Sequence, residues 1–193
     1  MTIERSKSPT TVFTDGAAKG NPGPGGWAAI VVAAGRVREL GGGSRHTTNN
    51  RMELTGPIEA LSHLKETPGR VTVHTDSTYV IRGIREWIPS WQRRGWRTME
   101  GKDVLNRELW ERLWTLTQNH EGGVEWHYVR GHVGIPGNER VTRSPTRMRC
   151  RRILAFMKDR LPIIPFGYSI SPRTRIFLPQ AAGRERTQRR IRT

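Results

Sequence analysis

The order in which strand-like and helix-like segments follow one another is the strongest constraint on the fold. Runs with the composition or alternation of strands lie at residues 10–15, 27–33, 70–76 and 124–129, and the turn at Gly35 predicts a further strand at residues 37–43. Runs with apolar residues at helical spacing lie at residues 52–64, 77–88 and 103–119. The first three strands follow one another across a glycine-rich loop and a tight turn, which predicts an antiparallel meander.

Helices separate the later strands, which is typical of parallel crossovers. The sequence therefore predicts an α/β fold: a mixed five-stranded sheet, with an antiparallel meander followed by parallel strands, packed against helices. The loop over residues 16–26 is expected to follow a first strand that ends at Asp15, and Ser77 is expected to cap a helix.

The positive charge of the chain is concentrated behind residue 140. The net charge of the 193 residues is +16. Residues 1–140 contain 19 basic and 15 acidic side chains, whereas residues 141–193 contain 14 basic and only 2 acidic ones. The latter segment also has five prolines and no sustained hydrophobic period. We predict a disordered N-terminus (1–9), one folded domain with a truncated last helix (10–140) and a poorly ordered Arg/Pro-rich tail (141–193) that attracts polyanions.

The sequence has no feature of secreted or membrane proteins. Cys150 is the only cysteine, so an intrachain disulfide is impossible. The first residues lack the apolar core of a signal peptide, and no apolar run approaches the roughly 20 residues that cross a bilayer. We expect a cytoplasmic, monomeric protein without a membrane partner.

Three carboxylates are the candidate chemical centre. Asp15 and Asp76 end strand-like runs, and Glu53 lies in the expected first turn of a helix. Ligands bind at the carboxyl ends of strands in open α/β sheets, and converging carboxylates repel one another unless a cation neutralises them. Oxygen ligands without a Cys or His cluster favour Mg²⁺ or Mn²⁺ over zinc. Taken singly, each acid has a simpler interpretation as a stabilising charge at the end of an element.

Five motifs, in order, resemble type 1 ribonuclease H of the bacterial kind, within the ribonuclease H-like superfamily. They are TDGAAKGNPGPGGW (14–27), TNNRMEL (48–54), HTDSTY (74–79), WIPSWQRRGW (87–96) and RGHVGIPGNER (130–140). The resemblance extends from about Thr10 to Arg140, and the tail behind it is unrelated.

The resemblance implies an endoribonuclease that hydrolyses the RNA strand of RNA·DNA hybrids. Asp15, Glu53 and Asp76 would hold two Mg²⁺ ions, or Mn²⁺, around the scissile phosphate, and the products would carry 5′-phosphate and 3′-hydroxyl ends. His132, in a glycine-rich loop, matches the histidine that assists proton transfer or product release. A solvated surface residue is the alternative interpretation of that histidine.

The resemblance also implies two sets of substrate-binding residues. Those expected at the minor groove, where the 2′-hydroxyl distinguishes RNA from DNA, are Gly16, Asn21, Asn49 and Asn50; Asn138 is also expected to bind substrate. Those of a basic protrusion that holds the DNA strand are Trp87, Trp91, Arg93, Arg94 and Trp96. The alternative for the asparagines is turn formation and helix capping, and for the tryptophans it is a place in the core.

The chain departs from the family behind Arg140. A fourth carboxylate is expected two residues after the Asn-Glu-Arg motif, but Thr142 occupies that position, which leaves the second metal site incomplete. A catalytically impaired hybrid-binding protein is therefore the alternative function. A transposase or integrase nuclease domain shares the fold and the acids, but the asparagine set and the tryptophan-rich protrusion argue against it.

We hypothesise that a one-nucleotide deletion, or a sequencing error, has shifted the reading frame near codon 142. Restoring one G in a possible coding sequence for residues 141–147 yields Val-Asp-Glu-Ile-Ala-Asn-Ala, which supplies the missing acid. The competing interpretation is an authentic basic extension that adds affinity for nucleic acid. Sequencing the gene across codons 135–193 decides: the frameshift predicts an acidic, apolar-periodic helix in another frame, and its absence rejects the hypothesis.

Overall fold

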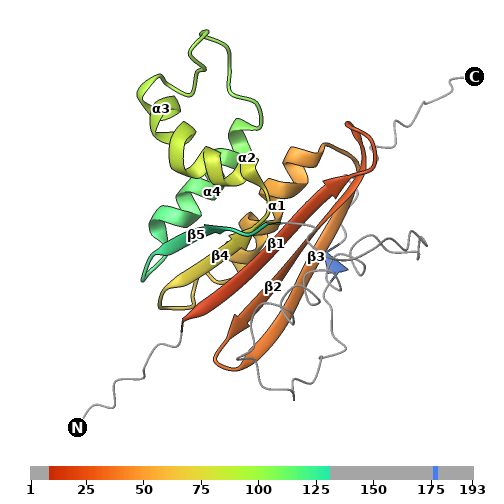
Figure 1. The fold of residues 1–193 in the computed structure, drawn as a ribbon, viewed down its shortest axis with the longest axis vertical. Coiled ribbons are helices and arrows are strands. Elements are labelled where there is room, and N and C mark those ends of the chain that lie inside the picture. Colours follow the sequence, from red (N-terminus) through yellow and green to blue (C-terminus); the bar gives the residue numbers. More distant parts are fainter. Residues whose placement is uncertain (1–8, 131–175, 178–193) are drawn as a thin grey trace, which may run out of the picture.

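The computed structural model describes residues 9–130 and 176–177. A mixed sheet with the strand order β5-β4-β1-β2-β3-β6 forms the centre of the molecule (Figure 1). Its strands are β1 (Thr10–Ala18), β2 (Gly23–Ala33), β3 (Arg36–Thr47), β4 (Val71–Thr75), β5 (Val124–Tyr128) and β6 (Ile176–Phe177). β1 to β3 form the antiparallel meander, and β4 and β5 add in parallel beside β1. The predicted mixed five-stranded sheet is confirmed, and the two-residue β6 pairs in parallel with β3.

The helices cover one face of this sheet. They are α1 (Asn49–His63), α2 (Thr78–Arg82), the π-helical turn η1 (Gly83–Trp87), α3 (Ile88–Arg93) and α4 (Arg107–Asn119). α1 packs on β1 and β2 and is itself contacted by α4 (Figure 1). Leu54 and Ile58 of α1 and Trp110 and Leu113 of α4 are completely buried. The main hydrophobic core therefore lies between the sheet and the α1–α4 pair.

The glycine-rich hairpin between β1 and β2 is more regular than the sequence predicts. β1 continues past Asp15 to Ala18, and Gly16 pairs with Trp27, so the predicted loop over residues 16–26 is wrong for most of its length. Glycine weakens strands on average, but a ladder of backbone hydrogen bonds needs no side chain. Asp15 consequently lies within β1 and not at its end.

The helix predicted over residues 77–88 is interrupted. Ser77 caps α2, as predicted, by accepting a hydrogen bond from the Val80 amide, but the helix widens into η1 before it continues as α3 to Arg93. A Cβ atom on Gly83 would overlap the indole ring of Trp110. The π-helical turn thus begins where the α4 indole lies directly against the backbone of the preceding helix.

The helix predicted to begin at Asp103 begins only at Arg107. Asn106 has a left-handed backbone with φ of 58°, a conformation that cannot be continued into a right-handed helix. Leu105 is 82% exposed, although its spacing places it on the apolar face of the predicted helix. The helical pattern is therefore correct only from Leu109 onward.

The opposite face of the sheet carries an aromatic row. Phe13, His74 and His127 are cross-strand neighbours on β1, β4 and β5; the rings of Phe13 and His74 are stacked, and that of His127 is tilted against His74. Burial lowers the pKa of His74, and the charge of His127 lowers it further. These side chains alternate with Val12, Val73 and Trp126, which belong to the hydrophobic core on the other face of the sheet.

Two remaining expectations concern the two ends of the chain and the membrane. The predicted N-terminus (1–9) and basic tail (141–193) lie almost entirely outside the described residues. Within the described ranges, no helix combines the length and hydrophobicity needed to cross a bilayer.

Substituting Gly83→Ala tests the packing at η1. The added methyl group would overlap the Trp110 ring, so we expect the free energy of unfolding to fall by about 1–3 kcal/mol, as for other overpacked sites. Urea denaturation measures this change. Gln92→Ala, at an exposed position of α3, is the control and should change it by less than about 0.5 kcal/mol. Equal stability of the Gly83→Ala and parent proteins would contradict the close packing.

Candidate active site

The backbones of Asp15 and Asp76 occupy neighbouring positions in the β1–β4 pair. β1 and β4 are parallel, and Thr14 is the register partner of Thr75. Asp15 follows Thr14 within β1, and Asp76 is the first residue after β4. The two carboxylates therefore lie at the same edge of the sheet, where the carboxyl ends of parallel strands present ligand-binding groups.

Gly16 brings the third carboxylate to this edge. A Cβ atom on Gly16 would overlap the peptide unit between Met52 and Glu53, so α1 contacts β1 backbone to backbone at this point. Glu53 lies in the second turn of α1, which starts at Asn49, and not in the first turn as predicted. The absence of a side chain at Gly16 is what permits Glu53 to approach Asp15.

Two hydrogen-bond donors hold the Glu53 carboxylate. Asn49 Nδ2 donates to Oε1 at 2.8 Å, and Ser77 Oγ donates to Oε2 at 2.7 Å. The same Ser77 oxygen accepts from the Val80 amide at 3.1 Å. One hydroxyl therefore caps α2 and orients Glu53, which ties the start of α2 to α1.

The electrostatics of Glu53 report the proximity of the two aspartates. Burial raises the pKa of Glu53 above its ordinary value of 4.5, and the hydrogen bonds from Ser77 and Asn49 lower it part of the way back. The negative charges of Asp76 and Asp15 raise this pKa further. The three predicted carboxylates are thus close enough to interact, and a divalent cation would relieve their repulsion.

The donor chemistry of this edge fits a hard cation. All candidate ligands are carboxylate oxygens, which Mg²⁺ and Mn²⁺ prefer. Among the described residues, no group of three His, Cys, Asp or Glu side chains is already gathered to hold an ion. Each Glu53 oxygen is hydrogen-bonded instead to Asn49 or Ser77, as expected for carboxylates that repel one another without a cation.

The predicted minor-groove residues lie beside this edge, as far as they are described. The Asn49 amide donates to Asn21 Oδ1 at 3.3 Å, which ties the β1–β2 turn to the start of α1, and Asn50 is exposed. Turn formation and helix support are thus part of what these asparagines do, and their contacts with substrate stay predictions. His132 and Asn138 lie outside the described residues.

The predicted protrusion residues gather on η1, α3 and the following loop. Trp87, Trp91 and Trp96 are half-buried, and their rings contact in sequence at centroid distances of 5.7 and 6.2 Å. Arg93 is exposed, and Arg94 Nε donates to the Arg97 carbonyl. The tryptophans therefore also serve as core, as the alternative interpretation expected.

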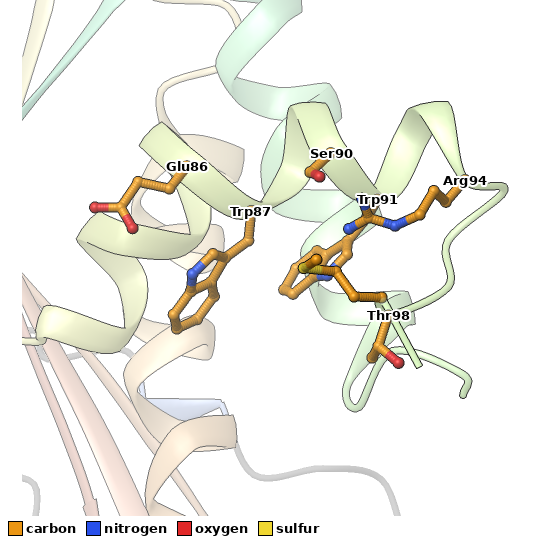
Figure 2. A pocket seen from close by; sticks show the side chains of 7 residues that line it. Glu86, Trp87, Ser90, Trp91, Arg94 and Thr98 are labelled. Atoms are coloured by element: carbon orange, nitrogen blue, oxygen red, sulfur yellow. The ribbon is translucent and has the colours of Figure 1, made fainter. Parts of the chain in front are cut away.

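A cavity of about 340 Å³ opens in this protrusion (Figure 2). Its lining residues are Glu86, Trp87, Ser90, Trp91, Arg94, Thr98 and Met99. The indoles and Met99, which is 89% exposed, supply apolar surface, and Arg94 supplies a positive charge. Sequence reasoning missed Ser90, Thr98 and Met99 because only their position in space connects them with the tryptophans.

A hydrogen-bonded chain connects α1 with the protrusion. Arg51 Nη1 donates to Asn106 Oδ1 at 3.1 Å and to Glu108 at 2.6 Å. Asn106 Nδ2 donates to the Tyr79 hydroxyl, which also accepts from Trp110 Nε1. The left-handed Asn106 is thus a junction between the helix that carries Glu53 and the aromatic cluster, and neither its spacing nor its type revealed that role.

Comparisons with known sequences agree with the family that the five motifs indicate. The sequence pattern of the family described as RNase H matches residues 7–147. A Ribonuclease H of Thiobacillus denitrificans is 54% identical over 129 residues, which cover 67% of this chain and 85% of the relative. A Ribonuclease H of Xanthomonas campestris pv. campestris is 57% identical over 130 residues, with coverages of 67% and 85%.

Solved structures agree as well. LC9-RNase H1, described as a type 1 RNase H with the type 2 active-site motif, superposes with a TM-score of 0.57 at 35% identity, over 65% of this chain and 64% of that chain. LC11-RNase H1, solved in complex with an RNA/DNA hybrid, superposes with a TM-score of 0.51 at 21% identity, over 63% of this chain and 86% of that chain. The latter similarity concerns the fold alone.

Ser77→Ala should weaken divalent-cation binding about 10–100-fold, the usual effect of removing a group that orients a metal ligand. The variant loses the hydroxyl that donates to Glu53, and the lost helix cap costs about 1 kcal/mol of stability in addition. Isothermal titration with Mg²⁺ measures the affinity. Ser77→Thr keeps a hydroxyl and is the matched control, which should bind nearly as the parent does. Equal affinities of the Ala and Thr variants would show that Ser77 does not position Glu53.

Mg²⁺ should stabilise the protein in a pH-dependent manner. Because the pKa of Glu53 is raised in the folded state, its ionised form destabilises the fold above that pKa, and this destabilisation disappears as the pH falls through it toward 4.5. Mg²⁺ binds the ionised form, so the gain in Tm should be largest near pH 7–8 and fade on acidification.

The variant Asp76→Asn provides the comparison for that experiment. It removes one of the charges that repel Glu53, so in EDTA at neutral pH its Tm should equal or exceed that of the parent. It should also gain less from Mg²⁺. A Mg²⁺-induced shift that is the same at pH 5 and pH 8, or unchanged by Asp76→Asn, would contradict the proposed cation site.

Proposed function

We propose that this chain, which belongs to the ribonuclease H family, is an endoribonuclease of RNA·DNA hybrids and uses two Mg²⁺ ions held by Asp15, Glu53 and Asp76. Mn²⁺ is the expected substitute, since it shares the oxygen-ligand chemistry of Mg²⁺. The observation that carries the proposal is the environment of Glu53. Its pKa is raised by burial and by the charges of Asp76 and Asp15, at the point where β4 ends beside β1.

When bound, the ions supply an activated water and stabilise the departing 3′ oxygen, which leaves 5′-phosphate and 3′-hydroxyl ends. The chain itself prepares their binding. Asn49 and Ser77 fix the direction of the Glu53 carboxylate, and the contact of Gly16 with α1 fixes its distance from β1. His132 is proposed to assist proton transfer or product release.

The substrate is proposed to lie across the edge and the protrusion. Asn21, Asn49, Asn50 and Asn138, with the backbone of Gly16, would contact the minor groove, where 2′-hydroxyls identify the RNA strand. The DNA strand would reach the protrusion cavity. There, apolar indole surface suits a deoxyribose and the exposed guanidinium of Arg94 suits a phosphate, with Trp96 and Arg93 beside it.

The alternative is a hybrid-binding protein with impaired catalysis. Its basis is Thr142, which stands where the family pattern has a fourth carboxylate and which lies outside the described residues. Under this alternative the second ion binds weakly, and the protein binds hybrids more readily than it cuts them.

Cleavage of an RNA·DNA hybrid labelled on the RNA strand distinguishes the two. With Mg²⁺ or Mn²⁺ we expect 5′-phosphorylated RNA fragments, and no cleavage of duplex DNA. Asp15→Asn should reduce the cleavage rate at least about 100-fold, since the loss of a ligand exceeds that of its supporting groups. Glu66→Gln removes an exposed acid that lies beyond the C-terminal end of α1, away from Glu53, and should leave the rate unchanged.

Two outcomes would overturn the proposal. Hybrid binding without cleavage at any Mg²⁺ or Mn²⁺ concentration would favour the impaired binding protein. Cleavage that persists unchanged in Asp15→Asn would remove the three carboxylates from the mechanism.

A further inference from the structure

The aromatic row on the sheet face opposite α1 contains two histidines whose rings lie side by side. His74 of β4 and His127 of β5 are direct register partners on adjacent parallel strands. Their ring centroids are 5.3 Å apart, with an angle of 31° between the planes. Phe13 stacks on the other side of His74 at 4.8 Å, which limits the orientations open to that ring.

We propose that His74 and His127, with Glu125 as a third ligand, form a binding site for Zn²⁺ or a similar transition-metal ion, separate from the catalytic carboxylates. Imidazole nitrogens are preferred ligands of Zn²⁺, Ni²⁺ and Cu²⁺, whereas Mg²⁺ prefers oxygen. The site would therefore select a different class of ion from the one that the reaction uses.

The separation of the rings fits a shared ion. With metal–nitrogen bonds of about 2.0–2.1 Å, a zinc ion lies about 3.2 Å from the centroid of each imidazole ring. Two such rings at a tetrahedral angle have centroids about 5.2 Å apart. The observed 5.3 Å is close to this separation, and rotation of the rings, whose planes differ by 31°, would direct one nitrogen of each toward the ion.

The surroundings supply a ring nitrogen without a hydrogen-bond partner, and a carboxylate that can serve as a further ligand. His74 Nδ1 is buried and has no hydrogen-bond partner within the described part of the chain, which is a costly state for a ring nitrogen. Glu125 Oε2 lies 3.9 Å from His127 Nε2, while Oε1 of the same carboxylate is paired with Arg70 at 3.0 Å. Glu125 thus faces the histidine pair with one oxygen and balances Arg70 with the other.

The three side chains are not a preformed cage. No group of three such residues in the described ranges is already arranged around one point, so binding requires Glu125 to close toward the histidines and water to complete the coordination. The His127 side chain is 53% exposed, which gives an ion access from solvent. An ion there would clip β5 to β4, the strand that leads into Asp76.

Thermal unfolding of the full chain in saturating Mg²⁺, with and without added ZnCl₂, tests the proposal. Mg²⁺ keeps the carboxylate edge occupied, so a rise in Tm with Zn²⁺ reports another site. The rise should be absent in His127→Ala, whose exposed position tolerates truncation, and reduced in Glu125→Gln. His63→Ala, which removes an exposed histidine of α1, should retain the full rise.

Cu²⁺ electron paramagnetic resonance provides a second readout that does not depend on stability. The parent should display the hyperfine pattern of two nitrogen ligands, and His127→Ala should lose it, together with at least about a tenfold loss of Zn²⁺ affinity in calorimetry. A Tm rise or a two-nitrogen spectrum that persists in His127→Ala would place the ion elsewhere and overturn the proposal. No response of the parent to Zn²⁺ would overturn it as well.

Discussion

The contact between Gly16 and the Met52–Glu53 peptide unit determines where the three candidate carboxylates meet. β1 and α1 touch through their backbones at that point, closer than any side chain would permit. The register of β1 with β4 places Asp15 beside Asp76, and the α1 contact adds Glu53 above them. Burial and the charges of Asp76 and Asp15 raise the pKa of Glu53, and a divalent cation would relieve the repulsion between these carboxylates.

The carboxylate edge and the protrusion form one connected unit. Ser77 uses its single hydroxyl to cap α2 and to orient Glu53. On the other side of α1, Arg51 reaches Asn106, and Asn106 reaches the Tyr79 hydroxyl that Trp110 also contacts. These hydrogen bonds tie the groups proposed to position the metal ions to the aromatic cluster that lines the protrusion cavity. Both ends of the proposed substrate path are thus connected through α1.

Local periodicity was sufficient for the sheet and for the acidic residues, but not for features that depend on distant partners. Strand-like runs and the turn at Gly35 predict all five main strands, and the ends of the predicted strands indicate the Asp15–Asp76 pair even though β1 continues beyond Asp15. The π-helical turn at Gly83 depends on the ring of Trp110, which is far away in sequence. The left-handed Asn106, and the cavity residues Ser90 and Met99, likewise acquire their roles only through tertiary contacts.

A measurement of the pKa of the Glu53 carboxyl group tests most directly whether Asp15, Glu53 and Asp76 share one cation site. Carbon-detected NMR titration of protein labelled at the glutamate side chains gives this value with and without saturating Mg²⁺. A shared site predicts a pKa of Glu53 above 4.5 in the metal-free protein. It also predicts a strong decrease of this pKa when Mg²⁺ is bound, because the cation stabilises the ionised form. An ordinary pKa that Mg²⁺ leaves unchanged would contradict the claim that Asp15, Glu53 and Asp76 share one cation site.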